Sequence, residues 1–457
     1  MNKLTPKIGL RAATILVVSV IVGSGVFKKI APMSAELGSP TLLILCWVLA
    51  GLISLAGALS TAEMASMFPD SGGEYVYFQK IYGHFFAFLY GWGNFTVMKS
   101  AAIAALAYIF AQSFNSLIPL PEFSSQFTFF ENSSVKILAS FLIIALSYVN
   151  FRGVTFAETF SSLLTYTMFV AVGVFIVFGL SSDVGNWQNL TQKSSHFDET
   201  KLVGWGLLKS LTIASLGAFW GYEGWNHIGY IGEEVKNPKR NLPLALGIGT
   251  LIVILIYVLL NITFAYILPI DFFIELNNQP NKIAAVEVAN KLWGNVGIIF
   301  IACLILVTTL NATNSSILMS ARILYAMARD GLFFRRANSI HAKYQTPDIA
   351  IAFQAFWSVL LIWSGSFDQL TDMLVFASFI YYGATALGVI ILRIKHPEIE
   401  RKYRVVGYPF VPILFVLFCI LLFVITIINQ PREAMIGLAL VASGIPFYWF
   451  WGRKKGV

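Results

Sequence analysis

Two glycine-interrupted stretches contain residues whose types and spacing can bind a small zwitterion. They are residues 22–27, VGSGVF, and residues 219–226, FWGYEGWN. A glycine costs ~1 kcal/mol inside a helix, so paired glycines around a polar residue favour local unwinding. Unwinding would free N–H groups at 24–27 for an anion and carbonyl groups at 219–222 for a cation. If the two breaks face each other, they predict a site for the carboxylate and ammonium of an α-amino acid.

The first stretch alone is equally well explained by close helix packing, because small residues are enriched where helices touch in membranes. The second stretch favours unwinding at a site over simple helix packing, since Glu223 at mid-depth must face a cavity or a partner. Matching interruptions in two halves of a chain are a strong sequence indication of a transport site.

The elements that position these residues are predicted to be membrane helices. Of the 457 residues, 57% are hydrophobic and 12% are charged, about half the charge of a soluble domain. Since a span needs ~20 apolar residues, the uncharged stretches predict an all-α polytopic membrane protein with about twelve helices. The predicted spans are 12–36, 40–67, 82–117, 135–150, 157–181, 206–232, 242–269, 292–326, 347–364, 370–393, 409–429 and 433–451.

Positive charge predicts the topology. Lys and Arg gather near both termini and in the loops that follow even-numbered spans, whereas the loop 114–134 contains Glu122 and Glu131 and no Lys or Arg. Positive charge concentrates in cytoplasmic loops. We therefore expect a multi-pass protein of the cell inner (plasma) membrane with both termini cytoplasmic. The net charge of +8 is attributed to this topology, and no nucleic-acid partner is expected.

Five motifs in order resemble the amino acid–polyamine–organocation superfamily, and within it the L-type amino acid transporter branch. The motifs are GSGVF at 23–27, FPDSGGEY at 68–75, GYEGWN at 221–226, EEVKNPKRNLP at 233–243, and SAR at 320–322 followed by ARDG at 328–331. The resemblance implies the leucine-transporter fold, with discontinuous first and sixth helices and alternating access around a mid-membrane site. The implied units are a cytoplasmic N-terminus (1–11), inverted repeats of five helices (12–181 and 206–393), two additional helices (409–451) and a cytoplasmic C-terminus (452–457).

By position, the resemblance implies substrate-carboxylate contacts at Ser24, Gly25 and Val26, and substrate-ammonium contacts at Phe219, Trp220 and Gly221. Trp220 is also the implied aromatic gate. The candidates for the side-chain pocket are Lys99, Tyr222, Glu223 and Thr309. Two interpretations of Lys99 remain open, since it either faces the cavity or pairs with a carboxylate such as Glu223. Most other polar residues of the eighth span are expected to serve helix packing.

Three further features refine these expectations. Glu233 and Glu234 form either a salt-bridged inner gate with Arg11, Arg322 or Arg329, or part of a solvated loop. The fifth span has no Lys, with Met168 near the position where relatives often carry one, which leaves ion coupling open. The loop 114–134 has no Cys, so a disulfide-linked heavy chain, as in animal L-type members, is not expected.

The predicted activity is secondary transport of L-amino acids, with neutral exchange of small substrates such as Ser, Thr or Ala as the first hypothesis. A cationic amino-acid or polyamine carrier and a proton-coupled symporter are alternatives, and a sensor or channel is a remote one. Neither a catalytic cluster nor a phosphate loop is present, so no enzyme activity and no cofactor are expected. The five histidines lack metal-ligand spacing, no metal is expected, and His227 is interpreted as a packed side chain.

Overall fold

The computed structural model describes residues 6–121, 132–195, 203–279, 282–364 and 367–453, and the described part is helical. Glu122, Glu131 and parts of both predicted termini lie outside these residues. The helices are α1 (Leu10–Ile21), α2 (Gly25–Lys28), α3 (Ile30–Leu37), α4 (Pro40–Met67), α5 (Glu74–Ile81), α6 (His84–Gly93), α7 (Lys99–Leu117), α8 (Ser133–Phe151), α9 (Val154–Leu180), α10 (Trp205–Tyr222), α11 (Pro238–Ile267), α12 (Ile270–Leu276), α13 (Ala284–Trp293), α14 (Asn295–Arg329), α15 (Asp348–Ser364), α16 (Phe367–Lys395), α17 (Phe410–Asn429), α18 (Pro431–Ala442) and α19 (Gly444–Arg453).

Helices occupy all twelve stretches predicted as spans, which confirms an all-helical polytopic membrane protein. Ten of the described helical segments are long and apolar enough to cross a membrane. The remaining two predicted spans are 206–232, where the helix is interrupted, and 347–364, where α15 has only 17 residues.

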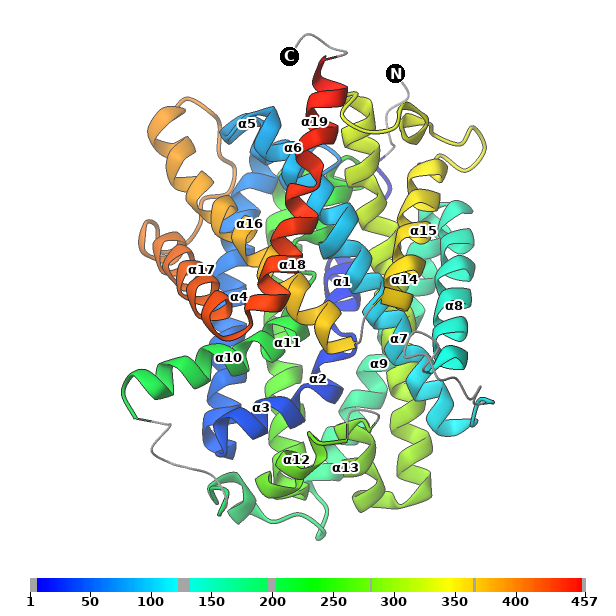
Figure 1. The fold of residues 1–457 in the computed structure, drawn as a ribbon, viewed down its shortest axis with the longest axis vertical. Coiled ribbons are helices and arrows are strands. Elements are labelled where there is room, and N and C mark those ends of the chain that lie inside the picture. Colours follow the sequence, from blue (N-terminus) through cyan, green and yellow to red (C-terminus); the bar gives the residue numbers. More distant parts are fainter. Residues whose placement is uncertain (1–5, 122–131, 196–202, 280–281, 365–366, 454–457) are drawn as a thin grey trace.

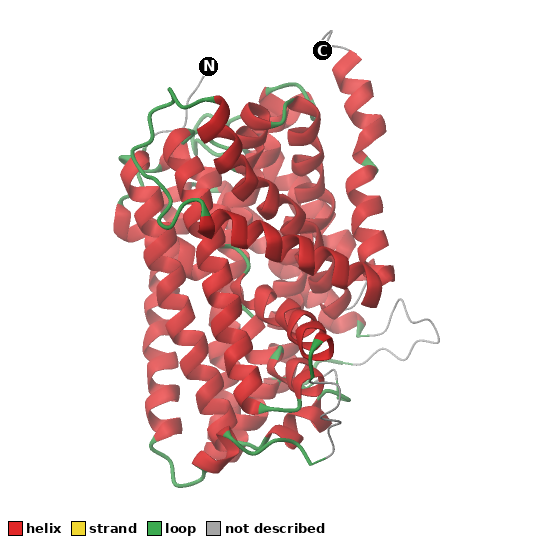
Figure 2. Ribbon diagram, turned by 90° about the vertical axis from the view of Figure 1, so that its left-hand side faces the viewer, coloured by secondary structure: helices red, strands yellow, loops and turns green. Residues whose placement is uncertain are grey.

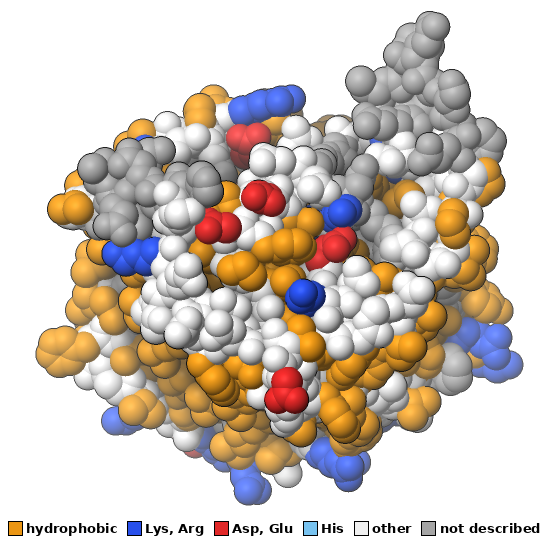
Figure 3. All heavy atoms as spheres, turned by 90° about the horizontal axis from the view of Figure 1, so that it is seen from below, with side chains coloured by type: hydrophobic (Ala, Val, Ile, Leu, Met, Phe, Trp, Pro, Cys, Tyr) orange, Lys and Arg blue, Asp and Glu red, His pale blue; other side chains and the backbone are white. Residues whose placement is uncertain are grey.

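The outer surface of the bundle is suited to lipid. Large apolar side chains are exposed on the outward faces of several helices, such as Phe141 on α8 and Leu414 on α17. Seen from the end opposite the termini, charged side chains lie on the end face, and hydrophobic side chains dominate toward the rim (Figure 3). Apolar flanks and polar ends are what a bilayer core requires of a spanning protein.

The two interrupted spans lie inside the bundle. Helix α1 packs against α11, α9 and α14, while α10 packs against α4 and α3. The long helices run side by side through the molecule (Figures 1 and 2), and residues 214–232 are buried throughout. Both termini lie at the same end as α5 (Figure 1). The helices around α1 and α10 therefore shield their broken backbones from lipid, where unpaired N–H and C=O groups are costly.

Candidate functional site

Both predicted helix breaks are present. Helix α1 ends at Ile21 and α2 begins at Gly25, with Gly23 N donating to Ile21 O at 2.9 Å. Helix α10 ends at Tyr222, and a 3₁₀ segment, η5 (Trp225–Glu234), continues the sixth span. The first N–H groups and last C=O groups of a helix have no partner within it. The start of α2 and the end of α10 therefore lie at the positions where the sequence predicts free N–H and C=O groups.

Glycine is required where the two breaks meet. A Cβ on Gly25 would collide with Gly221 Cα and would lie 2.8 Å from Gly221 N. Gly224, between α10 and η5, has a φ of +110°, which favours glycine because other residues lack room in that conformation. The backbones of the first and sixth spans are therefore in direct contact across the break.

A small cavity lies at this junction. Its lining comes from both broken spans, α7 and α14. The lining residues are Val20, Ile21, Gly23, Ser24, Gly25, Ala102, Leu106, Trp220, Glu223, Gly224, His227 and Ser316. Of the predicted site residues, Ser24, Gly25, Trp220 and Glu223 line this cavity.

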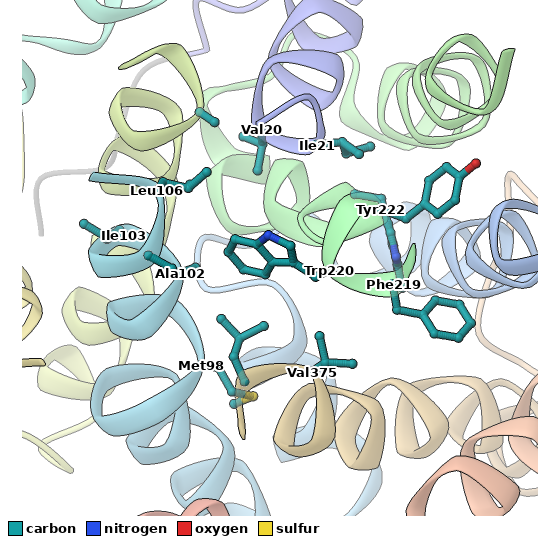
Figure 4. Close-up of a cluster of buried hydrophobic side chains, with 14 of the residues drawn as sticks. Val20, Ile21, Met98, Ala102, Ile103, Leu106, Phe219, Trp220, Tyr222 and Val375 are labelled. Carbon is teal, nitrogen blue, oxygen red and sulfur yellow. The ribbon is translucent and has the colours of Figure 1, made fainter. Parts of the chain in front are cut away.

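The Trp220 side chain covers the first break. Its Nε1 donates a hydrogen bond to Ser24 Oγ at 3.2 Å, and its ring meets Phe367 edge-on at 5.9 Å between centroids. The indole points toward Ala102 and Leu106, whereas the rings of Phe219 and Tyr222 point the other way (Figure 4). An indole bound to the residue implied for carboxylate binding is suited to act as a gate, which remains a prediction.

Lys99 pairs with Glu223. The Lys99 Nζ lies 2.6 Å from Glu223 Oε1, and both side chains are buried. Tyr382, on α16, donates its hydroxyl to the same carboxylate at 2.8 Å. Lys99 is the first residue of α7 after a π-helical segment, Asn94–Met98, a type of irregularity that often marks functional sites. Of the two interpretations of Lys99, the pairing interpretation is confirmed.

Comparison with known proteins identifies the family. A family model described as amino acid permease matches residues 8–450. The chain belongs to the amino acid permease family. This confirms the resemblance to the amino acid–polyamine–organocation superfamily, and the protein is an amino acid transporter rather than an enzyme.

The relatives of this permease cover nearly all of its length. It is 29% identical over 456 residues to the serine/threonine exchanger SteT of Bacillus subtilis (strain 168), covering 99% of this chain and 98% of that protein. It is 29% identical over 459 residues to the human b(0,+)-type amino acid transporter 1, with coverages of 99% and 89%. The human large neutral amino acids transporter small subunit 2 is 28% identical over 454 residues, with coverages of 99% and 82%.

The remaining predicted site residues of the permease lie outside the described cavity lining. Tyr222 donates its hydroxyl to Trp47 O at 3.1 Å, and Gly221 O accepts from Tyr257 at 2.9 Å. A carbonyl oxygen has two lone pairs, so Gly221 O retains one for an ammonium group. Thr309 donates to Ile305 O, one turn earlier in α14. Val26 and Phe219 are buried beside the breaks.

Several polar residues of the eighth span join neighbouring helices by hydrogen bonds, whereas Thr308, Thr309 and Thr313 donate to carbonyl groups of α14 itself. Ser315 Oγ lies 2.9 Å from Ser19 on α1 and 2.8 Å from Ser161 on α9, and Asn311 Nδ2 donates to Thr165 at 2.9 Å. These hydroxyls and amides join three helices close to the first break. On α9 these contacts are made by Ser161 and Thr165, which precede Met168 in the sequence, and the Met168 side chain is buried.

A hydrogen-bond network runs from the Lys99–Glu223 pair toward α5. The Tyr382 hydroxyl, which donates to Glu223, also lies 3.2 Å from Asn226 Oδ1, and Asn226 Nδ2 donates to Glu74 Oε1 at 2.7 Å. Glu74 begins α5, in the connection between the second and third spans, and burial raises its pKa from 4.5 to about 7. Ionisation of Glu74 therefore opposes folding. As pH rises from about 4.5 to about 7, the folded state loses up to ~3 kcal/mol relative to the unfolded state.

Near the end that carries the termini, ion pairs join η5 to α14, so Glu233 and Glu234 are salt-bridged to two of the three predicted arginines. Their role as an inner gate stays a prediction. Arg322 Nε lies 3.0 Å from Glu234 in a buried pair, and Arg329 lies 3.3 Å from Glu233 in a partly exposed one. Arg11 instead donates to Tyr166 at 2.8 Å.

Two polar residues that line the cavity are not predicted from the sequence as site residues: His227 and Ser316. The signal for His227 is its place four residues after Glu223, about one helical turn beyond the break. The signal for Ser316 is its place two turns beyond Thr309 on α14, which puts both side chains on one face of the helix.

Proposed function

We propose that this permease is an exchanger of small neutral L-amino acids that works by alternating access around the cavity between the two helix breaks. The observation that carries the proposal is the Lys99–Glu223 pair, 2.6 Å apart at the cavity. Because the cation of Lys99 balances the one carboxylate among the described lining residues, the pocket has no net charge to offer a charged side chain.

The substrate's main-chain groups would bind at the breaks. In the proposal the carboxylate lies against the N–H groups at Ser24, Gly25 and Val26, where the start of α2 favours negative charge. The ammonium lies against the carbonyls of Phe219, Trp220 and Gly221. The contact between Gly25 and Gly221 supports this arrangement. It brings the N–H groups at the start of α2 close enough to the carbonyl groups at the end of α10 for one small amino acid to contact both.

Alternating access would use closures on the two sides of the cavity. On one side Trp220 lies over Ser24, and on the other the Arg322–Glu234 pair joins η5 to α14. In the proposed leucine-transporter fold, 12–181 and 206–393 are inverted repeats that rock about the site. The termini are assigned to the cytoplasm, which the basic loops support. Transport without a disulfide-linked heavy chain is part of the proposal and is supported by the absence of Cys from 114–134.

The second candidate is a cationic amino-acid carrier. One observation favours it, namely that Glu223 itself lines the cavity. A cationic side chain would have to displace Lys99 from Glu223 or bind beside an ammonium group, and two like charges at such range repel.

The test is uptake of radiolabelled amino acids into proteoliposomes preloaded with unlabelled ones, with Glu223→Gln beside the wild type. We expect wild-type uptake of Ser, Thr or Ala that requires internal neutral amino acid. Exchange of Arg or Lys by the wild type that is lost in Glu223→Gln would establish the cationic carrier instead. Uptake into empty vesicles driven by an imposed pH gradient would establish a proton-coupled symporter.

A further inference from the structure

We propose that His227 recognises the substrate's side chain and selects small neutral amino acids that carry a hydroxyl group. The proposal rests on the exchanger function above and assigns its specificity to one residue. Ser and Thr should therefore be preferred to Ala and Val, which offer the same pocket only methyl groups.

His227 is held firmly at the cavity. It follows the Gly224 turn at the start of η5, and its backbone N donates to Gly224 O at 3.0 Å. Its side chain lines the cavity and is only 1% exposed, with its ring 5.3 Å from that of Tyr230. The turn and the packing together fix the direction of the imidazole.

Both imidazole nitrogens of His227 are buried without a hydrogen-bond partner among the described residues. Two polar neighbours of His227 are already engaged: Glu223, which lines the same cavity, and Tyr230, whose ring packs against the imidazole. Glu223 is held by Lys99 and Tyr382, and the hydroxyl of Tyr230 contacts Tyr90 and Asn226. Buried polar atoms in folded proteins are nearly always paired. A substrate group is therefore the natural partner for this imidazole.

The chemistry of the imidazole defines the class of side chain. A neutral imidazole has one N–H donor and one acceptor nitrogen, and a hydroxyl likewise donates and accepts. An aliphatic side chain would leave both nitrogens unpaired, which is how a polar site rejects an apolar analogue. The lining of the cavity also includes the apolar side chains of Ala102, Leu106 and Val20, which favour a short substrate side chain.

The experiment compares isosteric substrates as competitors of exchange in proteoliposomes. In the wild type, the concentration that halves serine exchange should be ~10-fold lower for Thr than for its isostere Val, and ~10-fold lower for Ser than for Ala, as two neutral hydrogen bonds provide. This comparison needs no variant. Equal competition within both pairs, in a protein that exchanges amino acids, overturns the assignment of a hydroxyl.

Variants then assign the effect to His227. His227→Leu should bring both ratios to about 1 while competition by Ala changes little, and His227→Gln, which keeps a donor and an acceptor, should retain most of the preference. Ser316→Ala tests the other polar residue that was not predicted at the cavity, and it should lower both ratios less than His227→Leu does. Unchanged ratios in His227→Leu, or ratios lost in Ser316→Ala alone, overturn the role of His227. Absence of any exchange by the wild type refutes the exchanger function instead.

Discussion

Replacement of Lys99 by methionine should turn Glu223 from a paired carboxylate into a cation-binding one. Methionine keeps an unbranched side chain of similar length, so the packing at the start of α7 is largely preserved. The hydroxyl of Tyr382 would still hold the carboxylate at 2.8 Å. The negative charge of Glu223 would then have no cation beside it at the cavity wall, where Glu223 is only 7% exposed.

The magnitude follows from burial. Removing one partner of a buried ion pair costs about 3–5 kcal/mol, because the remaining charge has left water without compensation. A substrate that brings its own cation recovers part of that energy. Recovery of about 1.4–2.8 kcal/mol corresponds to ~10- to 100-fold tighter binding of a small cationic amino acid.

The assay is competition for serine exchange by L-2,4-diaminobutyrate, a short amino acid with a second ammonium group. Lys99→Met should gain inhibition by this compound relative to the wild type and should melt at a lower temperature. The matched control is the double variant with Glu223→Gln. It removes both charges, so it should lose the gained inhibition and recover much of the stability.

The reasoning would be refuted by a folded Lys99→Met variant that still exchanges serine but binds diaminobutyrate no better than the double variant does. That result would mean that pocket shape, rather than the Lys99–Glu223 pair, excludes cationic side chains.

Three further predictions concern other parts of the permease. Gly25→Ala should weaken substrate affinity ~10- to 100-fold, because the added Cβ collides with Gly221 at the site and overpacking costs about 1–3 kcal/mol; Gly173→Ala, which has open space around it, should exchange normally. Arg322→Met should destabilise the protein by about 3–5 kcal/mol in thermal unfolding, and Arg329→Met, from the partly exposed pair, by under ~1 kcal/mol. Glu74→Gln should melt at a higher temperature than wild type at pH 8 but not at pH 4, since only the ionised Glu74 opposes folding; equal differences at both pH values would contradict its raised pKa.

Sequence alone determined those features that depend on local chemistry and on the solvent. Apolar stretches of span length can fold stably only as helices in lipid, and helices lie over all twelve of them. Glycines flanking Ser24 and Glu223 favour unwinding by their backbone freedom, and the breaks lie at those positions. The family motifs were likewise local, and the family model that matches residues 8–450 confirms the family that they indicate.

Tertiary structure decided which polar side chains meet. Lys99 and Glu223 are 124 positions apart, and their pairing depends on how α7 packs beside the sixth span, which no local pattern encodes. The choice of Ser316 rather than Thr309 at the cavity depends on the axial position of α14 relative to the two breaks, because residues two turns apart share a face but differ in depth. For His227 the sequence favoured a packed side chain. In the structure, Glu223 and Tyr230 bond to other residues, and both ring nitrogens of His227 are buried without a hydrogen-bond partner among the described residues. That observation makes His227 a candidate for substrate recognition.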